Sequence, residues 1–155
     1  LVQVAKGQSA APNLCGMLED PNVLKLFHFG RFDIAAMFET FGALTAPVYC
    51  TKIASRLVRT YTDRHGLKNL LQELLSVDIS KQQQSSDWGS KKLSKAQVEY
   101  AASDVLYLHR LRDSLNQMMI REDRMEIAQS CFDFLPTRAR LDLAGWPDND
   151  IFAHS

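Results

Sequence analysis

The chain has 155 residues, of which 46% are apolar, and its 18 basic residues balance its 18 acidic ones. No apolar run approaches the roughly 20 residues of a membrane span, and balanced charge excludes attraction to nucleic acid through net charge alone, so function must come from a local site. The three cysteines are widely spaced and follow no metal-ligand pattern. This is typical of buried thiols in a reducing compartment and predicts a cytoplasmic protein.

The first half of the chain alternates between segments of strand and helix character. Short apolar runs predict strands, and apolar residues at helical spacing, bounded by Gly, Pro, Ser or Thr, predict the helices between them. The predicted order is a strand over 1–5, a turn at Gly7, a helix over 11–18, a strand over 23–29, a helix over 32–41 that stops at Gly42, a strand over 46–50, a helix over 51–61 capped by Thr51, and a helix over 67–75. This alternation predicts an α/β layer architecture. Since the chain begins within an apolar run, we expect further sequence upstream.

A capping box starts the helix predicted over 94–112. The Ser94 side chain can cap the first turn while Gln97 reaches back to the Ser94 amide, and no Gly or Pro interrupts the residues that follow. Apolar residues at helical spacing predict a stripe that faces the core: Val98, Ala101, Ala102, Val105, Leu108 and Leu115. Tyr100 and Asp104, about one turn apart, lie on the flank of this stripe, where a cleft can form.

The segments on either side of this helix differ in character. The irregular loop over 76–92 is long enough to be functional or mobile; we expect its QQQSS centre to move and Trp88 to anchor it. Residues 113–155 are predicted to be a helical C-terminal portion, with a helix over 121–135 ended by Pro136. No internal repeat or linker divides the chain, so we expect one domain over 1–155.

Three polar residues carry the predicted chemistry. Asp33 follows a strand and a Gly and lies in the first turn of a helix, where the helix dipole favours a carboxylate at the carboxyl end of the strand. Together with Asp104 and Tyr100, it would suit a divalent-metal site that polarises a phosphate and activates a water molecule. Each residue also has an ordinary interpretation, as a first-turn acid or a solvated helix flank, and the spacing alone does not decide between the two.

Three separated stretches resemble the signature of the ribonuclease D family, within the DEDD exonuclease superfamily. They are HFGRFD (28–33), SSDW (85–88) and LSKAQVEYAASDVLYL (93–108). The His-x-x-x-x-Asp of the first is similar to the family's second exonuclease motif, and the Tyr-x-x-x-Asp of the third is similar to its third motif in the tyrosine form. The resemblance covers residues 20–112, and Lys81, Leu93 and Gln97 fall where the family also has Lys, Leu and Gln.

This resemblance implies a ribonuclease H-like α/β/α sandwich with a mixed sheet. It also implies a 3′-5′ exonuclease that uses two divalent cations, Mg²⁺ or Mn²⁺, to release 5′-monophosphates from single-stranded RNA 3′ ends, with DNA as a second candidate substrate. Carried over by residue, Asp104 is a direct metal ligand, Asp33 holds the second metal directly or through water, and Tyr100 orients the attacking water. Further candidates for substrate contacts are His28, Phe29 and Phe32, because aromatic rings can stack on a terminal base. A Phe between a strand and a helix is, however, more often part of the core. His28 is better explained as a residue that forms a hydrogen bond to the metal ligands than as a ligand itself.

The sequence departs from the family at its first motif. Asp-x-Glu supplies two of the family's four acids, and residues 1–20 contain only Glu19 and Asp20, at a predicted helix end. We therefore expect the first strands and half of the metal site to be absent from this chain, and we expect it to bind metal poorly and show no exonuclease activity unless an upstream segment is restored. Two other interpretations stay open: a catalytically inactive nucleic-acid-binding module of the same fold, and an α/β scaffold without a site. The oligomeric state is not predicted.

Overall fold

The computed structural model describes residues 1–79, 83 and 85–154. Within this part of the chain lie seven helices and two strands. In order they are α1 (Pro12–Glu19), β1 (Lys25–Phe27), α2 (Arg31–Phe41), β2 (Val48–Cys50), α3 (Thr51–Val58), α4 (Leu67–Leu75), α5 (Lys95–Leu106), α6 (Leu108–Arg121) and α7 (Met125–Leu143). Each element predicted between residues 11 and 75 is present, although both strands and α3 are shorter than the sequence indicated.

The two strands form a parallel pair. Lys25, Leu26 and Phe27 lie opposite Val48, Tyr49 and Cys50, and α2 connects the strands. Because parallel strands run in the same direction, both end at one edge of the sheet, and the residues that follow them emerge side by side. This edge is where the candidate site forms.

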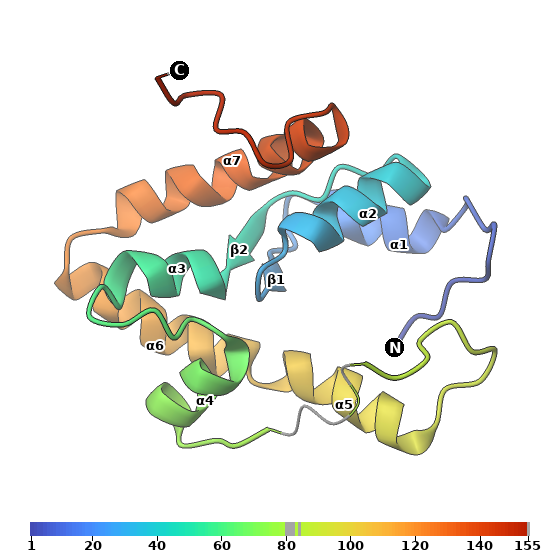
Figure 1. Ribbon diagram of the computed structural model, residues 1–155, viewed down its shortest axis with the longest axis horizontal. Helices are drawn as coiled ribbons and strands as arrows, with labels where there is room; N and C mark the ends of the chain where they lie inside the picture. Colours follow the sequence, from blue (N-terminus) through green and yellow to red (C-terminus); the bar gives the residue numbers. More distant parts are fainter. Residues whose placement is uncertain (80–82, 84, 155) are drawn as a thin grey trace.

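Helices enclose β2 in one apolar core. Figure 1 shows α7 running beside α2 along one side of the molecule and α3 beside α6 along the other, in agreement with the contacts between these pairs. The Tyr49 ring of β2 packs against Phe132 of α7, with ring centroids 4.5 Å apart. An ion pair also joins the ends of two helices: Arg31 Nε lies 2.6 Å from Asp142 Oδ2, whose side chain is 8% exposed. This pair fixes the first turn of α2, which contains Asp33.

The predicted strand over residues 1–5 is wrong. These residues are irregular and exposed, although the turn at Gly7 is present with φ of 82°. A strand is stable only when a neighbour accepts and donates its backbone hydrogen bonds. Among the described residues, the sheet consists of β1 and β2 alone, so this apolar run has no strand beside it.

Pro136 does not end a helix as predicted, since α7 continues through it to Leu143. A proline inside a helix removes one hydrogen bond to the preceding turn and costs about 3 kcal/mol. Against this cost stands the burial of three side chains along one face of α7: Phe132, Leu135 and Ala139. Their burial outweighs the local preference of a single residue, which is a tertiary effect that the sequence pattern did not reveal.

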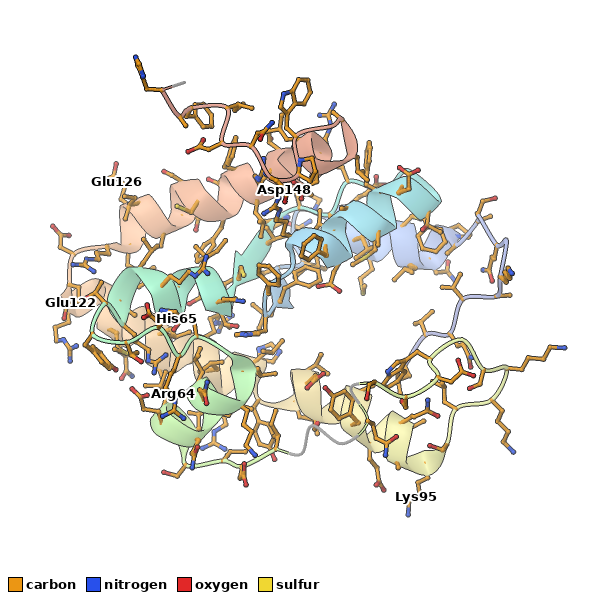
Figure 2. The ribbon with its side chains drawn as sticks, viewed as in Figure 1. Arg64, His65, Lys95, Glu122, Glu126 and Asp148 are labelled. Atoms are coloured by element: carbon orange, nitrogen blue, oxygen red, sulfur yellow. The ribbon has the colours of Figure 1, made fainter. Side chains whose placement is uncertain are left out.

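The helix predicted over 94–112 is in fact two helices. The capping box at Ser94 is confirmed, but the chain leaves helical geometry at Tyr107 (φ −103°, ψ −1°), between α5 and α6. The predicted apolar stripe is buried only beyond this break, at Leu108 and Leu115, whereas Val98 and Val105 are 40% and 57% exposed. The break turns Leu108 into the core while α5 extends away from it, and Figure 2 shows Lys95, at the start of α5, on the outer edge of the molecule.

A buried arginine holds the connection between α3 and α4, where Figure 2 labels Arg64 and His65. The Arg59 side chain is 0% exposed and pairs with Glu73 of α4. Its Nη1 also donates to Ser55 Oγ at 3.1 Å and to the Arg64 carbonyl oxygen at 2.9 Å. A buried guanidinium is tolerated only when its donors are satisfied in this way. The connection it holds leads directly into residues 66–68, which line the candidate site.

Gly30, at the corner between β1 and α2, is expected to tolerate no side chain. A Cβ added there would lie 2.6 Å from both Cβ and Cγ of Phe27. We expect Gly30→Ala to lower the free energy of unfolding by about 2 kcal/mol in urea denaturation, as overpacking does elsewhere. The matched control is Gly16→Ala in α1, where nothing lies within 4 Å. That variant should be neutral or stabilising, and equal losses in both would contradict the steric explanation.

Candidate active site

A cavity of about 570 Å³ opens at the carboxyl edge of the sheet. Its walls come from the end of β1, one side of α2, the first turn of α3, the start of α4 and one face of α5. The sequence-predicted residues that line it are His28, Phe29, Asp33, Tyr100 and Asp104. Residues about 70 positions apart in sequence, from the first and third of the three stretches, are therefore brought to one cavity.

The strand-helix corner positions the first group of residues. Because Phe27 is paired with Cys50, the next residues, His28 and Thr51, meet at the sheet edge, and His28 Nδ1 lies 2.9 Å from Thr51 Oγ1. Thr51 was predicted to cap α3, but it is the first residue of that helix and its hydroxyl donates to the Phe27 carbonyl oxygen at 3.2 Å. Phe29 has φ of 67°, a left-handed conformation that costs about 1–2 kcal/mol in a non-glycine residue.

The α5 helix supplies the second group. Tyr100 and Asp104 are four residues apart and face the cavity together. Trp88 packs against Tyr100 with ring centroids 6.0 Å apart, so the predicted anchor of the 76–92 loop is confirmed. The expected mobility of the QQQSS centre concerns residues 82–86, of which 82 and 84 lie outside the described part of the chain, so it stays a prediction.

Burial sets the electrostatics of the cavity. It raises the pKa of Asp104 above the ordinary range of an aspartate. It raises the pKa of Asp33 in the same way, even though this residue is exposed at the cavity edge, and a backbone hydrogen bond partly opposes the shift. The pKa of Tyr100 is raised by burial first and by the charge of Asp104 second. Two carboxylates that are disfavoured as anions would gain from a nearby positive charge.

Two aspects of the site differ from the prediction. Phe32 is 58% exposed and does not line the cavity; its ring meets the edge of Phe29, with centroids 5.4 Å apart. Lys52 does line it, with Nζ 4.0 Å from the centroid of the Phe29 ring, and sequence reasoning missed it. The signal was present, since Lys52 follows a parallel strand just as Phe29 does.

No additional acid completes a metal cluster in the described part of the chain. It contains no group of three or more His, Cys, Asp or Glu side chains arranged to hold a metal ion. Glu19, Asp20 and Asp87, the other acids that could substitute for the missing first motif, do not line the cavity. The acidic side chains that line the cavity are thus Asp33 and Asp104.

His28 should make stability fall in mild acid. Burial, with the charge of Lys52 as a second cause, lowers its pKa from 6.5 to about 4. Between these values the unfolded chain binds a proton that the folded chain does not, so the contribution of His28 to stability is complete above pH 6.5 and lost as pH falls toward 4. Asp33 and Asp104 act in the opposite direction, because raised pKa values make their folded forms easier to protonate.

The variant His28→Asn separates the histidine from the two carboxyl groups. The free energy of unfolding would be measured in urea with EDTA present. Relative to the variant, the value for wild type should fall by about 2 kcal/mol between pH 7 and 4.5, after allowance for the partial exposure of His28. Parallel stability curves for the two proteins would refute the assigned pKa.

Several known proteins are similar to this chain in fold and in sequence. A family model described as 3'-5' exonuclease matches residues 1–120. The chain is similar to a nuclease solved in its apo form, with a TM-score of 0.97 and 67% identity over 99% of this chain and 74% of that chain. It is also similar to Brucella melitensis NrnC, solved bound to pGG (TM-score 0.95, 59% identical) and with bound Mg²⁺ (TM-score 0.94, 58% identical), with 99% of this chain and 74% of that chain covered in each.

Among curated proteins, Ribonuclease D of Gluconacetobacter diazotrophicus is 37% identical over 123 residues. The match covers 79% of this chain and 31% of that protein, so the chain spans about a third of the length of this relative. The resemblance that the three motifs indicated is confirmed, as is the ribonuclease H-like exonuclease fold. The chain belongs to the 3′-5′ exonuclease family that includes ribonuclease D.

Proposed function

We propose that the protein is a metal-dependent 3′-5′ exoribonuclease that removes nucleotides from the 3′ end of single-stranded RNA as 5′-monophosphates. The observation that carries this proposal is the meeting of Asp33, Tyr100 and Asp104 in one cavity, from helices on opposite sides of it. Family membership supports the reaction class. We extend the proposal to all 155 residues as one exonuclease domain, because a single apolar core draws on α2, α3, α4, α6 and α7.

The donor set fits divalent cations that bind together with the substrate. Mg²⁺ is commonly held by one or two carboxylates with phosphate oxygens and water, rather than by a complete protein cage. Asp33 and Asp104 would supply two of the carboxylates for the two proposed cations, and the two acids of the family's first motif, which residues 1–20 do not contain, would be needed to complete the site. When bound, such cations polarise the phosphate and lower the pKa of water. The structure of NrnC with bound Mg²⁺ supports Mg²⁺ as the cation, and Mn²⁺ is the alternative.

The chain's own residues would prepare the substrate and the attacking water. As a phenol, Tyr100 is protonated at neutral pH, and the upward shift of its pKa by burial acts in the same direction, so its hydroxyl can hold a water molecule by a hydrogen bond. Attack of this water on phosphorus forms one P–O bond and breaks the bond to the 3′ oxygen of the preceding nucleotide, which takes up a proton as it leaves. Lys52, in the cavity wall, adds positive charge that favours phosphate.

Short RNA is the substrate class that the comparisons favour, because a close relative is described as bound to pGG. DNA ends remain the second candidate. We propose a cytoplasmic location from the three unpaired thiols, Cys15, Cys50 and Cys131, which are free in the structure. Separately, no helix within the described residues has the length and apolar character needed to cross a membrane.

The test is a nuclease assay on the full-length protein. Radiolabelled pGG and a longer single-stranded RNA should release nucleoside 5′-monophosphates with Mg²⁺ or Mn²⁺, and EDTA should abolish the release. Binding of RNA without hydrolysis under all metal conditions would favour the inactive nucleic-acid-binding module. If the protein neither binds nor hydrolyses RNA, only the interpretation as an α/β scaffold without a site is left.

A further inference from the structure

A short chain of hydrogen bonds fixes the state of His28. Its Nδ1 lies 2.9 Å from Thr51 Oγ1, and Thr51 Oγ1 lies 3.2 Å from the Phe27 carbonyl oxygen. The Thr51 side chain is 0% exposed, so its hydroxyl has no alternative partner in water. A hydroxyl has a single proton to donate. The carbonyl can only accept, so both contacts are hydrogen bonds only if Thr51 donates to Phe27 and His28 Nδ1 donates to Thr51.

This arrangement leaves His28 Nε2 as an acceptor. The ring is neutral near pH 7, because burial lowers the pKa of His28 to about 4. With the proton on Nδ1, Nε2 carries a lone pair. His28 lines the cavity, and none of the polar side-chain atoms in the described residues is both buried and without a partner. No hydrogen bond to Nε2 is formed within this part of the chain, so the atom is open to the cavity.

The lone pair needs a donor from the ligand. Phosphate oxygens at neutral pH are acceptors, and the Lys52 ammonium group lies over the Phe29 ring. A bound metal ion is not the favoured partner, because hard cations such as Mg²⁺ and Mn²⁺ prefer oxygen ligands to a histidine nitrogen. The donors common to all four nucleotides are the sugar hydroxyls, whereas base donors differ from one nucleotide to the next.

We propose that His28 Nε2 accepts a hydrogen bond from a sugar hydroxyl of the bound nucleotide and thereby positions the terminal sugar. The proposal rests on the proposed function, since it assumes a nucleotide in this cavity. It makes His28 a residue that senses the 2′ or the 3′ hydroxyl. The 2′ hydroxyl distinguishes RNA from DNA, and the 3′ hydroxyl marks a free end.

Two variants separate the acceptor from the internal hydrogen bond. Asn at position 28 places an amide nitrogen near the position of Nδ1 and can still donate to Thr51, but it has no atom at the position of Nε2. Gln reaches the position of Nε2 with an oxygen acceptor. His109→Asn, at an exposed position of α6, is the matched control. Binding of three 5′-phosphorylated dinucleotides in Ca²⁺ would be measured for the full-length proteins: the diribonucleotide, and its analogues lacking the terminal 2′ or 3′ hydroxyl.

We expect wild type and His109→Asn to bind one of the two deoxy analogues about 10-fold more weakly than the diribonucleotide. His28→Asn should bind that analogue and the diribonucleotide equally, and His28→Gln should keep part of the preference. Whichever hydroxyl loses its effect in His28→Asn is the one that His28 contacts. If His28→Asn weakens all three ligands by the same factor, or keeps the wild-type preference, the proposal is wrong.

A measurement on the wild-type protein guards against variants that do not fold. The ¹⁵N chemical shifts of the His28 ring should show a protonated Nδ1 and an unprotonated Nε2, and the diribonucleotide should shift the Nε2 signal. A proton on Nε2 would overturn the proposal without any variant. Failure of the proposed function can be distinguished from failure of this proposal. In that case the wild-type protein would neither bind nor hydrolyse the diribonucleotide, whichever ring nitrogen of His28 carries the proton.

Discussion

Asp104→Asn is expected to lower nucleotide release by the full-length protein about 10³-fold or more. The amide has nearly the same shape as the carboxylate but no negative charge, and loss of several kcal/mol of transition-state stabilisation corresponds to this factor. The fold should persist. Burial already disfavours the Asp104 anion, as its raised pKa indicates, so the neutral amide should leave stability unchanged or slightly increased.

The matched control for this change is Asp113→Asn on α6. Asp113 is 62% exposed and pairs with its neighbour Arg112 at the surface, outside the cavity. Steady-state hydrolysis of pGG and urea unfolding should be measured for both variants, with calorimetric titration of Mn²⁺ in the presence of nucleotide. Activity in Asp104→Asn within 10-fold of wild type would exclude a role for this residue as a metal ligand.

Tyr100→Phe should lower turnover about 10²-fold while metal and substrate binding persist, because only the hydroxyl that holds water is lost. The ring itself would remain, together with its packing against Trp88, so α5 should keep its position. The expected kinetic signature is a loss in kcat with KM little changed. The measurement is a full rate profile against substrate concentration at saturating Mg²⁺.

Tyr107→Phe is the natural comparison, since Tyr107 adjoins the same helix but packs against the core and does not line the cavity. It should retain wild-type turnover. Should Tyr100→Phe be as active as Tyr107→Phe, the Tyr100 hydroxyl would have no part in the mechanism.

Local signals were sufficient for much of the fold. The capping box at Ser94 is present as predicted, and α2 ends at Gly42, which adopts φ of 71°. Such signals work because they depend on neighbours within a few residues. The errors occur where distant contacts decide: buried residues keep α7 helical through Pro136, and packing of Leu108 divides the predicted helix at Tyr107.

The same distinction applies to the site. Asp33, Tyr100 and Asp104 were found from strand ends, helix position and family motifs, and the cavity unites them. Lys52 and the hydrogen bond from His28 to Thr51 depend on the register between β1 and β2. Pairing of Phe27 with Cys50 is a relation between two strands, and no pattern within one segment specifies it.

The break in the helix at Tyr107 affects the width of the cavity, measured between α2 and α5. Within α5, the spacing of Tyr100 and Asp104 is set by the rigid geometry of one helical turn. Their separation from Asp33 is instead set by the angle at which α5 leaves α6, because Asp33 belongs to α2, which the Arg31–Asp142 ion pair fastens to α7. Small rotations about this joint would therefore widen or narrow the gap between Asp33 and Asp104, while Tyr100 and Asp104 would move as a unit.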